Sequence, residues 1–533
     1  MALRKLPVLL LFFASFAAWT DKGPIAIVIN DSPISYDPHH AITMQEAQIF
    51  TAIYEGLITF HPQSLEPTPG IAESWTVSAD KKVFTFNLNK NARFDNGKPV
   101  TAAIVRDSWL RLLSPNENAE YSVLLDPVIG AKEYREGKLS DTSKIGIKVA
   151  NDYLLEIDMK EPAAHFLKVL SHHSLSPIYP GNLKSGLWQP SGNIVGNGAY
   201  GIANISEDKI ELEKNAYYWD AENVKTDKIE IIRSSDPGQN TNLFNYGKAH
   251  WLLSDADFDN LLSYEYVQMN PEFASSFFFF SVKNKVFANP KVRSGLAHIL
   301  AWEKIRAEER FNYPVSYFIP PLADYPVQEG IETQNMAKGL SLLKEAGYPK
   351  GKGLPTITIR IGQSEVDRET AGLMKKSWEA ALDVNVEIDE LDWSLYYDSL
   401  KRDDYVLGTY TWIGDYGDPL TFLQLFQAKS NLNDSGYNDE RYDKLISDSM
   451  SLQKTERYKK LAEAEKILLD EAEVLPINQP YAVNIIDLDV ISGWDTNLLD
   501  IHPMKYLELV NPPIPPNIVS LPGKLIGENY IRP

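Results

Sequence analysis

Apolar residues along this chain follow two different patterns, and the pattern changes near residue 283. In the first half, short segments alternate between apolar and polar residues or are wholly apolar, which predicts β-strands. Residues 277–282 form an almost wholly apolar run, which favours a buried central strand. Two helices are expected among these strands, over residues 46–54 and after Thr101, a residue type that caps helix N-termini. The other predicted strands are residues 25–29, 84–88, 154–159, 210–212 and 229–232.

In the second half, segments with helical spacing of apolar residues interleave with short strands, which is typical of an α/β domain. One predicted helix, around residues 337–343, ends before Gly347 and Pro349, a glycine C-cap followed by a helix breaker. The proline-rich segment after Val510 is expected to be an extended strap or disordered, because proline donates no backbone hydrogen bond. The other predicted helices are residues 292–305, 374–381 and 455–472, and the predicted strands are residues 356–361, 384–388 and 405–410.

Size and composition exclude several classes of protein. The 533 residues are enough for two or three domains. The net charge of −20 argues against a nucleic-acid-binding surface, which needs clustered Lys and Arg. The absence of cysteine excludes disulfides, zinc–thiolate sites and cysteine nucleophiles. Neither a serine-hydrolase elbow nor an ATP-binding P-loop motif occurs.

The nine histidines carry no metal-binding pattern. None has the i, i+4 spacing with a glutamate that defines a zinc protease. The adjacent pairs His39-His40 and His172-His173 point in different directions on any regular element, so exposed loop positions are expected for the histidines. No metal and no cofactor are therefore expected.

Residues 1–18 have the pattern of a secretory signal peptide. Arg4 and Lys5 form a basic start, residues 6–16 an apolar run, and Ala17-Ala18 a small-residue exit. The apolar run is too short to span a bilayer as a helix. We therefore expect an exported protein, periplasmic or held at the cell surface. Trp19 stands where a bacterial lipoprotein carries its acylated cysteine, so no lipid anchor is expected there.

Residues 412–419 are the stretch with the most evident chemistry. They connect a predicted strand to a predicted helix, for which Asp418 is a suitable N-cap and Pro419 a suitable first residue. Trp412 and Asp415 in this connection offer an aromatic wall and a negative charge to a small ligand. The alternative is structural, with Asp415 solvating a loop near a helix N-terminus and Trp412 packed in the core.

A secreted hydrolase with paired carboxylates is a further alternative. Its two acids can come from any two strands, so sequence alone leaves this class open. Asp415 with Asp418, or Asp389 with Asp392, are conceivable pairs. Surface carboxylates are abundant in this chain, so such pairs also arise by chance.

Several short motifs, in order along most of the mature chain, carry a family resemblance. The sequence resembles the peptide-class extracytoplasmic solute-binding proteins that serve bacterial ABC importers, the oligopeptide-binding proteins in particular. The motifs are Tyr36-Asp37-Pro38, Ile53-Tyr54-Glu55-Gly56-Leu57, Pro69-Gly70-Ile71-Ala72-Glu73-Ser74-Trp75, residues 84–88 with 94–97 and 99–102, residues 192–200, residues 215–219, Val292-Arg293, residues 342–348 and the stretch 412–419.

The resemblance implies an α/β fold of two lobes that close over a ligand, joined by two crossovers, with an extra domain on the first lobe. Lobe I is then discontinuous and comprises residues 24–44, 178–283 and 486–533. The extra domain comprises residues 45–177, and lobe II comprises residues 284–485. The expected start of lobe II agrees with the change of pattern near residue 283.

The resemblance also implies roles for individual residues. Asp415 matches the aspartate that pairs with the α-ammonium of a bound peptide, a contact that every peptide with a free N-terminus provides. The peptide backbone is expected to pair with the main chain of both lobes. The residues implied for backbone pairing are Ser32, Pro33 and Ile34 of lobe I and Trp412, Ile413 and Gly414 of lobe II, and the expected side-chain pocket walls are Trp412, Trp393 and Tyr121.

Two positions depart from the family pattern. Thr409 stands where a relative has Arg, and Asp367 stands where a relative has His, so the binding of the peptide's C-terminus stays open. The predicted function is a monomeric receptor, not an enzyme, that captures oligopeptides and delivers them to an ABC permease in the cytoplasmic membrane. The family alternatives are receptors for dipeptides, oligosaccharides, nickel or haem.

Overall fold

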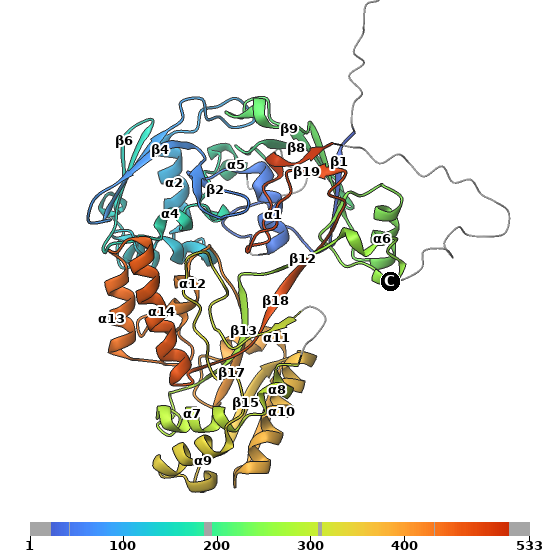
Figure 1. The fold of residues 1–533 in the computed structure, drawn as a ribbon. Helices are drawn as coiled ribbons and strands as arrows, with labels where there is room; N and C mark the ends of the chain where they lie inside the picture. Colours follow the sequence, from blue (N-terminus) through green and yellow to red (C-terminus); the bar gives the residue numbers. More distant parts are fainter. Residues whose placement is uncertain (1–22, 42, 186–193, 308–311, 431, 511–533) are drawn as a thin grey trace, which may run out of the picture.

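The computed structural model describes residues 23–510 apart from residues 42, 186–193, 308–311 and 431. The predicted signal segment and the proline-rich segment after Val510 lie outside the described residues. The described chain forms two bodies, an upper and a lower one in Figure 1. The chain passes between them along β12 (Val267–Pro271), β13 (Ala274–Phe280) and β18 (Val474–Ile486).

One 12-stranded sheet runs through both bodies, in the order β16-β15-β17-β13-β18-β11-β1-β10-β9-β8, with β12 and β14 paired to β18. β18 is the strand that both bodies share. Its first part pairs with β13 as far as Asn478. From Tyr481 onwards it pairs with β12, and at its end with β11. The two bodies are therefore joined by a continuous strand as well as by the β12–β13 segment.

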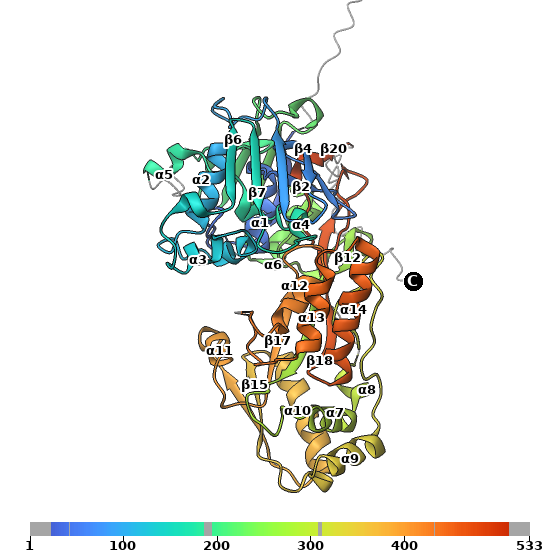
Figure 2. The same ribbon diagram turned by 90° about the vertical axis from the view of Figure 1, so that its left-hand side faces the viewer.

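The upper body contains strands β1, β8, β9, β10 and β11 of this sheet. It also contains a separate four-stranded sheet of order β4-β5-β7-β6 (Figure 2) and two short two-stranded sheets. One hydrophobic core cluster includes the buried residues of the four-stranded sheet. All of the buried residues in this cluster lie within residues 57–175, except Tyr416. The strands are β1 (Ile25–Ile29), β2 (Ile58–Phe60), β3 (Pro67–Pro69), β4 (Ala72–Val77), β5 (Val83–Leu88), β6 (Ile147–Asn151), β7 (Leu154–Asp158), β8 (Tyr200–Ile205), β9 (Lys209–Lys214), β10 (Lys228–Arg233), β11 (Trp251–Leu252), β19 (Ile491–Ser492) and β20 (Glu508–Leu509). The helices are α1 (Met44–Ile53), α2 (Ala102–Leu112), α3 (Ala131–Arg135), α4 (Phe166–Val169), α5 (Pro180–Ser185) and α6 (Pro237–Asn245), with the short 3-10 helix η1 (Glu120–Leu125).

The lower body packs helices against the strands β13, β15, β16 and β17 (Figures 1 and 2). The phenylalanines of β13 divide its core, because Phe277 and Phe279 belong to one cluster and Phe278 and Phe280 to another. The alternation follows from side chains pointing to opposite faces of a strand. The remaining strands are β14 (Asn312–Pro314), β15 (Ile357–Gly362), β16 (Val386–Leu391) and β17 (Leu407–Ile413), and the helices are α7 (Pro290–Ile299), α8 (Trp302–Ile305), α9 (Met336–Glu345), α10 (Glu365–Ala381), α11 (Trp393–Ser399), α12 (Leu420–Leu423), α13 (Glu440–Ser449) and α14 (Lys454–Asp470).

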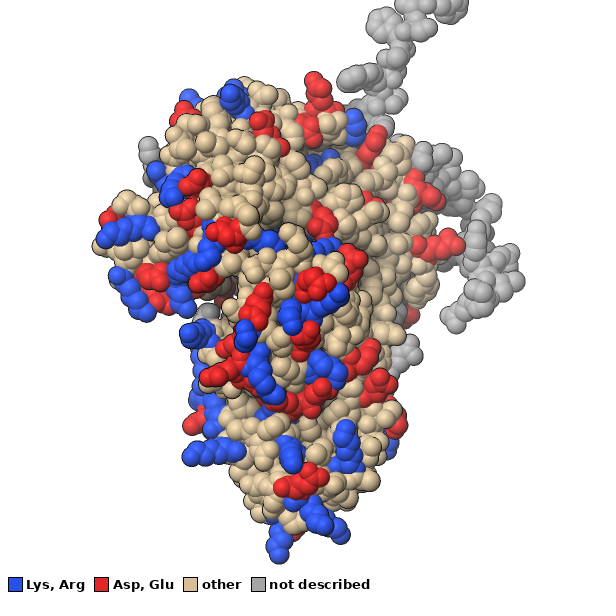
Figure 3. Space-filling view, turned by 60° about the vertical axis from the view of Figure 1, so that its left-hand side comes forward, with Lys and Arg blue, Asp and Glu red and all other residues tan. Residues whose placement is uncertain are grey.

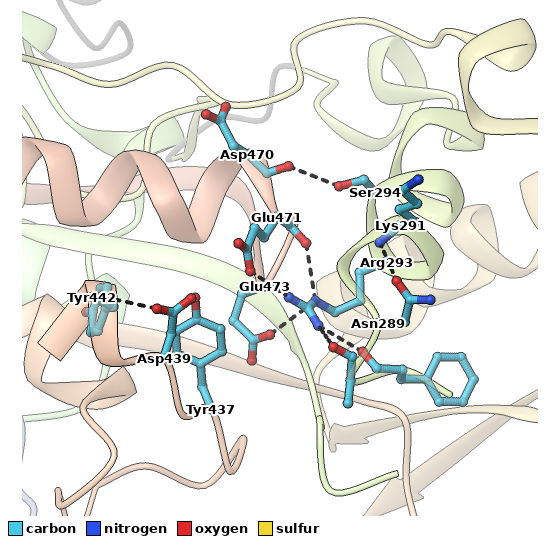
Figure 4. A network of polar contacts seen from close by, with 12 residues as sticks. Asn289, Lys291, Arg293, Ser294, Tyr437, Asp439, Tyr442, Asp470, Glu471 and Glu473 are labelled. Atoms are coloured by element: carbon cyan, nitrogen blue, oxygen red, sulfur yellow. Dashed lines mark hydrogen bonds and ion pairs between the residues drawn. The ribbon is translucent and has the colours of Figure 1, made fainter. Parts of the chain in front are cut away.

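A buried arginine ties α7 to the junction of α14 and β18 (Figure 4). The Arg293 guanidinium lies 3.2 Å from Glu473 Oε2 and 3.4 Å from Glu471 Oε2. It also donates to the carbonyl oxygens of Phe287 and Ala288, each at 3.0 Å. These contacts satisfy the guanidinium away from water, as a buried charge requires.

Charged side chains of both signs are interspersed on the face shown in Figure 3. Several pair along one helix, such as Lys444 with Asp448 at 2.9 Å. Within the described ranges, no helix combines the length and apolarity needed to cross a membrane.

Most predicted elements are present, but some expectations are wrong. The predicted helix 292–305 is two helices, because Leu300 has an extended backbone (ψ 140°) that separates α7 from α8. This break lets the buried Trp302 indole donate to Ala297 O at 3.0 Å.

The expectation of exposed histidines is also wrong, because His39, His165, His250 and His502 are buried. A polar partner compensates the burial of His250, whose Nδ1 accepts from Ala26 N at 2.9 Å. Burial lowers the pKa of His165 to about 4, which keeps the ring neutral.

Candidate functional site

The connection from β17 to α12 is fixed by contacts on both sides of Asp415. Gly414 N donates to Phe273 O at 2.8 Å, and a Cβ at Gly414 would overlap the Phe273 ring. Only glycine therefore lets the chain pass this close to β13. Tyr416 is buried in the core of the upper body and stacks on His165, with ring centroids 5.9 Å apart.

Asp418 anchors the far end of the same connection. Its carboxylate forms a two-pronged ion pair with Arg457 of α14, at 2.6 and 2.7 Å. Its Oδ1 also accepts from Leu420 N at 3.1 Å. The predicted helix start is wrong by one residue, because Pro419 is the N-cap of α12 and no side chain caps it. Lys168 of the upper body donates to Gly417 O at 2.7 Å. The turn that carries Asp415 is thus held by groups from both bodies.

A cavity of about 220 Å³ lies between the two bodies at this turn. Its walls come from α1, from η1 and from the segment around His172 and His173 in the upper body, and from the end of β17 in the lower body. Predicted site residues Ile413, Gly414, Asp415 and Tyr121 all line it.

Asp415 is the carboxylate of this cavity that lacks a positive partner. Thr421 Oγ1 donates to its Oδ2 at 3.4 Å, and within the described part of the chain no Lys or Arg forms an ion pair with it. Burial raises the pKa of Asp415 to about 6. The cavity therefore holds a partly desolvated carboxylate whose charge is not compensated by the protein.

Glu55, the other carboxylate that lines the cavity, is compensated. Lys505 Nζ lies 3.2 Å from Glu55 Oε1. Tyr218 OH donates to Oε1 at 2.5 Å, and the Trp219 indole N–H donates to Oε2 at 2.6 Å. A cationic ligand is thus attracted to Asp415 rather than to Glu55.

Three rings, tilted relative to one another and in contact, form the upper wall of the cavity. Tyr121 packs on His172 with centroids 4.2 Å apart, and His172 packs on His173 at the same separation. Burial lowers the pKa of His173 to about 4, so this wall carries no positive charge near neutral pH. Burial, together with the charge of Asp415, raises the pKa of Tyr121 to about 12.

A second cavity, of about 340 Å³, lies further along β17 in the lower body. Trp393 and Asp367 line it together with Thr409 and Thr411 of β17. The Trp393 indole lies against Gly362, where any Cβ would overlap the ring. The indole N–H donates to Gln363 O at 3.2 Å, which leaves the exposed part of the ring free to face a ligand.

Among the described residues, no strand pairs with one edge of β17 over most of its length. β13 pairs with all of β17, whereas β15 pairs with it only at Leu407. The backbone groups of Thr409 on this edge bind the Tyr396 hydroxyl. The hydroxyl accepts from the Thr409 N–H at 3.0 Å and donates to the Thr409 C=O at 2.8 Å. Thr411 and Ile413 present their N–H and C=O groups on the same side as Thr409, because strand residues alternate. This edge is suited to pairing with an extended chain.

The other predicted site residues lie apart from the first cavity. Trp412 is half-buried beside the core of the lower body, with its ring centroid 6.5 Å from that of Tyr410. Ser32, Pro33 and Ile34 line neither cavity. The Ser32 N–H donates to Asn30 Oδ1 at 3.0 Å, and its C=O accepts from Arg233 at 3.1 Å.

His172, His173 and Lys505 are cavity residues that sequence reasoning missed. The adjacent residues His172 and His173 are evident in the sequence, but the pair was interpreted as exposed loop residues. Lys505 gave no local signal, because its partner Glu55 lies 450 positions away. Among the described residues, no group of three His, Asp or Glu is arranged to hold a metal ion.

The two joined bodies, the shared strand β18 and the cavity between the bodies define a binding-protein architecture. Residues 66–434 match the family described as bacterial extracellular solute-binding proteins, family 5 Middle. Because this match covers more than half of the chain, the protein belongs to the family 5 extracellular solute-binding proteins.

Relatives along the whole length agree with this membership. The dipeptide-binding protein DppE of Bacillus subtilis is 27% identical, with 92% of each chain covered. The structure of the Escherichia coli murein tripeptide binding protein MppA superposes with a TM-score of 0.72 at 26% identity, covering 92% of this chain and 98% of that one. Haemophilus influenzae OppA in complex with the peptide RPPGFSPFR gives a TM-score of 0.71 at 25% identity, covering 92% and 99%. The α/β, two-lobed periplasmic-binding-protein fold implied by the motifs is confirmed.

Proposed function

We propose that this protein is the receptor of an ABC importer that captures oligopeptides by their free N-terminus and delivers them to a permease in the cytoplasmic membrane. The observation that carries the proposal is the uncompensated Asp415 carboxylate in the cavity between the two bodies. An α-ammonium group supplies the missing positive charge, and a charge-assisted hydrogen bond in a closed cleft stabilises the complex by about 1.5–3 kcal/mol.

The open edge of β17 supports a peptide rather than another cation. An extended peptide pairs its backbone with such an edge, whatever its side chains are. Trp412, Ile413 and Gly414 then provide the lower-body contacts, and Trp393 and Tyr121 provide walls for side chains. Ser32, Pro33 and Ile34 stay proposed as contacts of the closed, liganded form, in which the Ser32 backbone would exchange its present partners for the peptide.

The proposed division of the chain follows the same family. Lobe I comprises residues 24–44, 178–283 and 486–533, the extra domain residues 45–177, and lobe II residues 284–485. The strand β13, at the end of the second lobe I segment, crosses into the lower body and packs in its core. We propose that the protein acts in the periplasm as a monomer, by binding and release without turnover of the peptide.

Calorimetric titration with alanine peptides tests the ammonium contact. Wild-type protein should bind free peptides, and N-acetylation should weaken binding by about ten- to a hundredfold. Asp415→Asn should weaken binding of the free peptide and remove most of the difference that acetylation makes. Asp448→Asn changes an exposed carboxylate on α13 and should bind like wild type.

Three results would contradict the proposal. Equal affinity for free and acetylated peptides would exclude the ammonium contact. A rise in melting temperature with an oligosaccharide, nickel or haem, and none with any peptide, would assign the receptor to another solute. Release of free amino acids on prolonged incubation would point to a hydrolase.

A further inference from the structure

The second cavity contains a carboxylate, that of Asp367, which has no role in the proposed binding of the peptide's ammonium group or backbone. Asp367 lies in the first turn of α10, and its side chain interacts with the Ser364 hydroxyl. Burial raises the pKa of Asp367 to about 6, so removing water from this carboxylate is costly in the absence of a cation. The side chain is half-buried and faces the cavity that Trp393, Thr409 and Thr411 also line.

Two described arginines close to Asp367 in the sequence are paired with other acids. Arg368, the next residue, forms a two-pronged pair with Glu390 at 2.6 and 2.8 Å. Arg360 of β15 bonds Asp389 and Asp404, at 2.8 and 2.6 Å. Across the ranges that the structure describes, no Lys or Arg lines the second cavity. An anionic group would therefore meet uncompensated negative charge there.

The other walls suit the stem of a long cationic side chain. The Trp393 side chain is 43% exposed, and its ring stacks on Tyr397 with centroids 5.9 Å apart. An indole face attracts a cation and packs against the methylenes that precede it. The hydroxyls of Thr411 and Ser276, already paired with each other at 2.8 Å, add polar lining.

β17 connects the two cavities. Thr409 and Thr411 line the second cavity and Ile413 lines the first, and these three residues share one face of the strand. Thr411 and Asp415 are four positions apart, which corresponds to at most about 13 Å of extended chain. An extended peptide with its ammonium at Asp415 therefore reaches the second cavity within its first few residues.

Building on the proposed function, we propose that the second cavity is a subsite for a positively charged side chain of the bound peptide. The preferred ligands are peptides that carry lysine or arginine within the first few residues after a free N-terminus. Asp367 is the specificity-determining residue, and Trp393 holds the side-chain stem.

A lysine scan by calorimetry tests this subsite. Alanine pentapeptides carry lysine, norleucine or glutamate at each position after the first, and are titrated at physiological ionic strength. Norleucine keeps the length of the stem and removes only the charge. At one position, wild-type protein should bind the lysine peptide about ten- to a hundredfold more tightly than the norleucine peptide, with the glutamate peptide weakest.

Variants assign the effect to Asp367. Asp367→Asn and Asp367→Ser should each lose most of the preference for lysine over norleucine. Asp415→Asn should weaken all peptides and keep the lysine preference. Equal affinities for lysine and norleucine peptides at every position in wild type would overturn the subsite while leaving the proposed function intact.

The remaining outcomes are also decisive. A lysine preference that persists in both Asp367 variants would assign the selectivity to another site and overturn the inference. Failure of the wild-type protein to bind any peptide would overturn the proposed function, and the subsite with it.

Discussion

The Asp418 carboxylate and the Arg457 guanidinium form a two-pronged ion pair with both side chains almost fully buried, three positions after Asp415. The pair joins the turn that carries the binding carboxylate to α14. The Arg457 charge holds the pKa of Asp418 below its usual range although burial alone would raise it. The chain thus places a compensated carboxylate and an uncompensated one within a single turn.

Removing one partner of this pair should destabilise the protein strongly. We expect Arg457→Met to lower the free energy of unfolding by about 3–5 kcal/mol, because it leaves the Asp418 charge buried and unpaired. Arg441→Met is the matched control, since the Arg441 side chain is 66% exposed and its ion pairs with Asp439 and Glu471 should contribute only about 1 kcal/mol. Denaturant unfolding of both variants measures the difference. Similar losses in the two would show that the buried pair has no special role.

The network around Arg293 makes a second prediction about stability (Figure 4). Lysine offers one ammonium in place of the planar fork that meets Glu473 and two carbonyl groups, so Arg293→Lys should cost about 2–3 kcal/mol. Lys291 lies on α7 like Arg293, and Lys291→Ala removes its exposed pair with Glu345 of α9, so this substitution should be nearly neutral. Thermal and denaturant unfolding check both. A nearly neutral Arg293→Lys would contradict the assignment of these contacts as stabilising.

Local patterns in the sequence predicted much of the fold. The strand predicted at residues 25–29 coincides with β1, and Thr101 caps α2 by accepting from Ile104 N at 3.4 Å. These elements are set by neighbouring residues, so their signals are local. The break at Leu300 escaped prediction because it depends on how Trp302 packs in the tertiary core.

The site was only partly predictable for the same reason. The family resemblance selected Asp415, but its lack of a cation depends on where Arg457 and Lys505 point. Both of these form pairs with other carboxylates, Asp418 and Glu55. The histidines were wrongly expected at the surface, since burial depends on distant partners such as Ala26 for His250.

Gly362 makes a prediction about the second cavity. Gly362→Ala places a Cβ in the Trp393 ring, so it should displace the indole, weaken peptide binding and lower stability by about 1–3 kcal/mol. Gly372→Ala, within α10 and with open space around its Cβ, should instead stabilise by about 0.5–1 kcal/mol and leave binding unchanged. Unfolding curves and peptide titrations distinguish them. Wild-type affinity in the Gly362 variant would exclude Trp393 from ligand contact.

The raised pKa of Asp415 makes the binding carboxylate a source of instability in the empty protein. Its folded-state pKa is about 6, above the value of about 3.9 in an unfolded chain. Between these two values the folded state holds more protons, so stability falls as pH rises through that window. Asp415→Asn removes this dependence.

At about pH 7.5, Asp415→Asn should raise the free energy of unfolding by about 1–3 kcal/mol, allowing for partial exposure of the side chain. At about pH 4 the gain should shrink to about 0.5 kcal/mol or less, because the wild-type carboxyl is then mostly protonated in the folded state and about half protonated in the unfolded one. Saturating peptide should reverse the order at neutral pH, since ligand stabilises wild type in proportion to the logarithm of its concentration over Kd. Denaturant unfolding at both pH values, with and without peptide, measures all of these terms. An equal gain in unfolding free energy at the two pH values would mean that the substitution acts through packing. The charge of Asp415 would then not destabilise the empty protein.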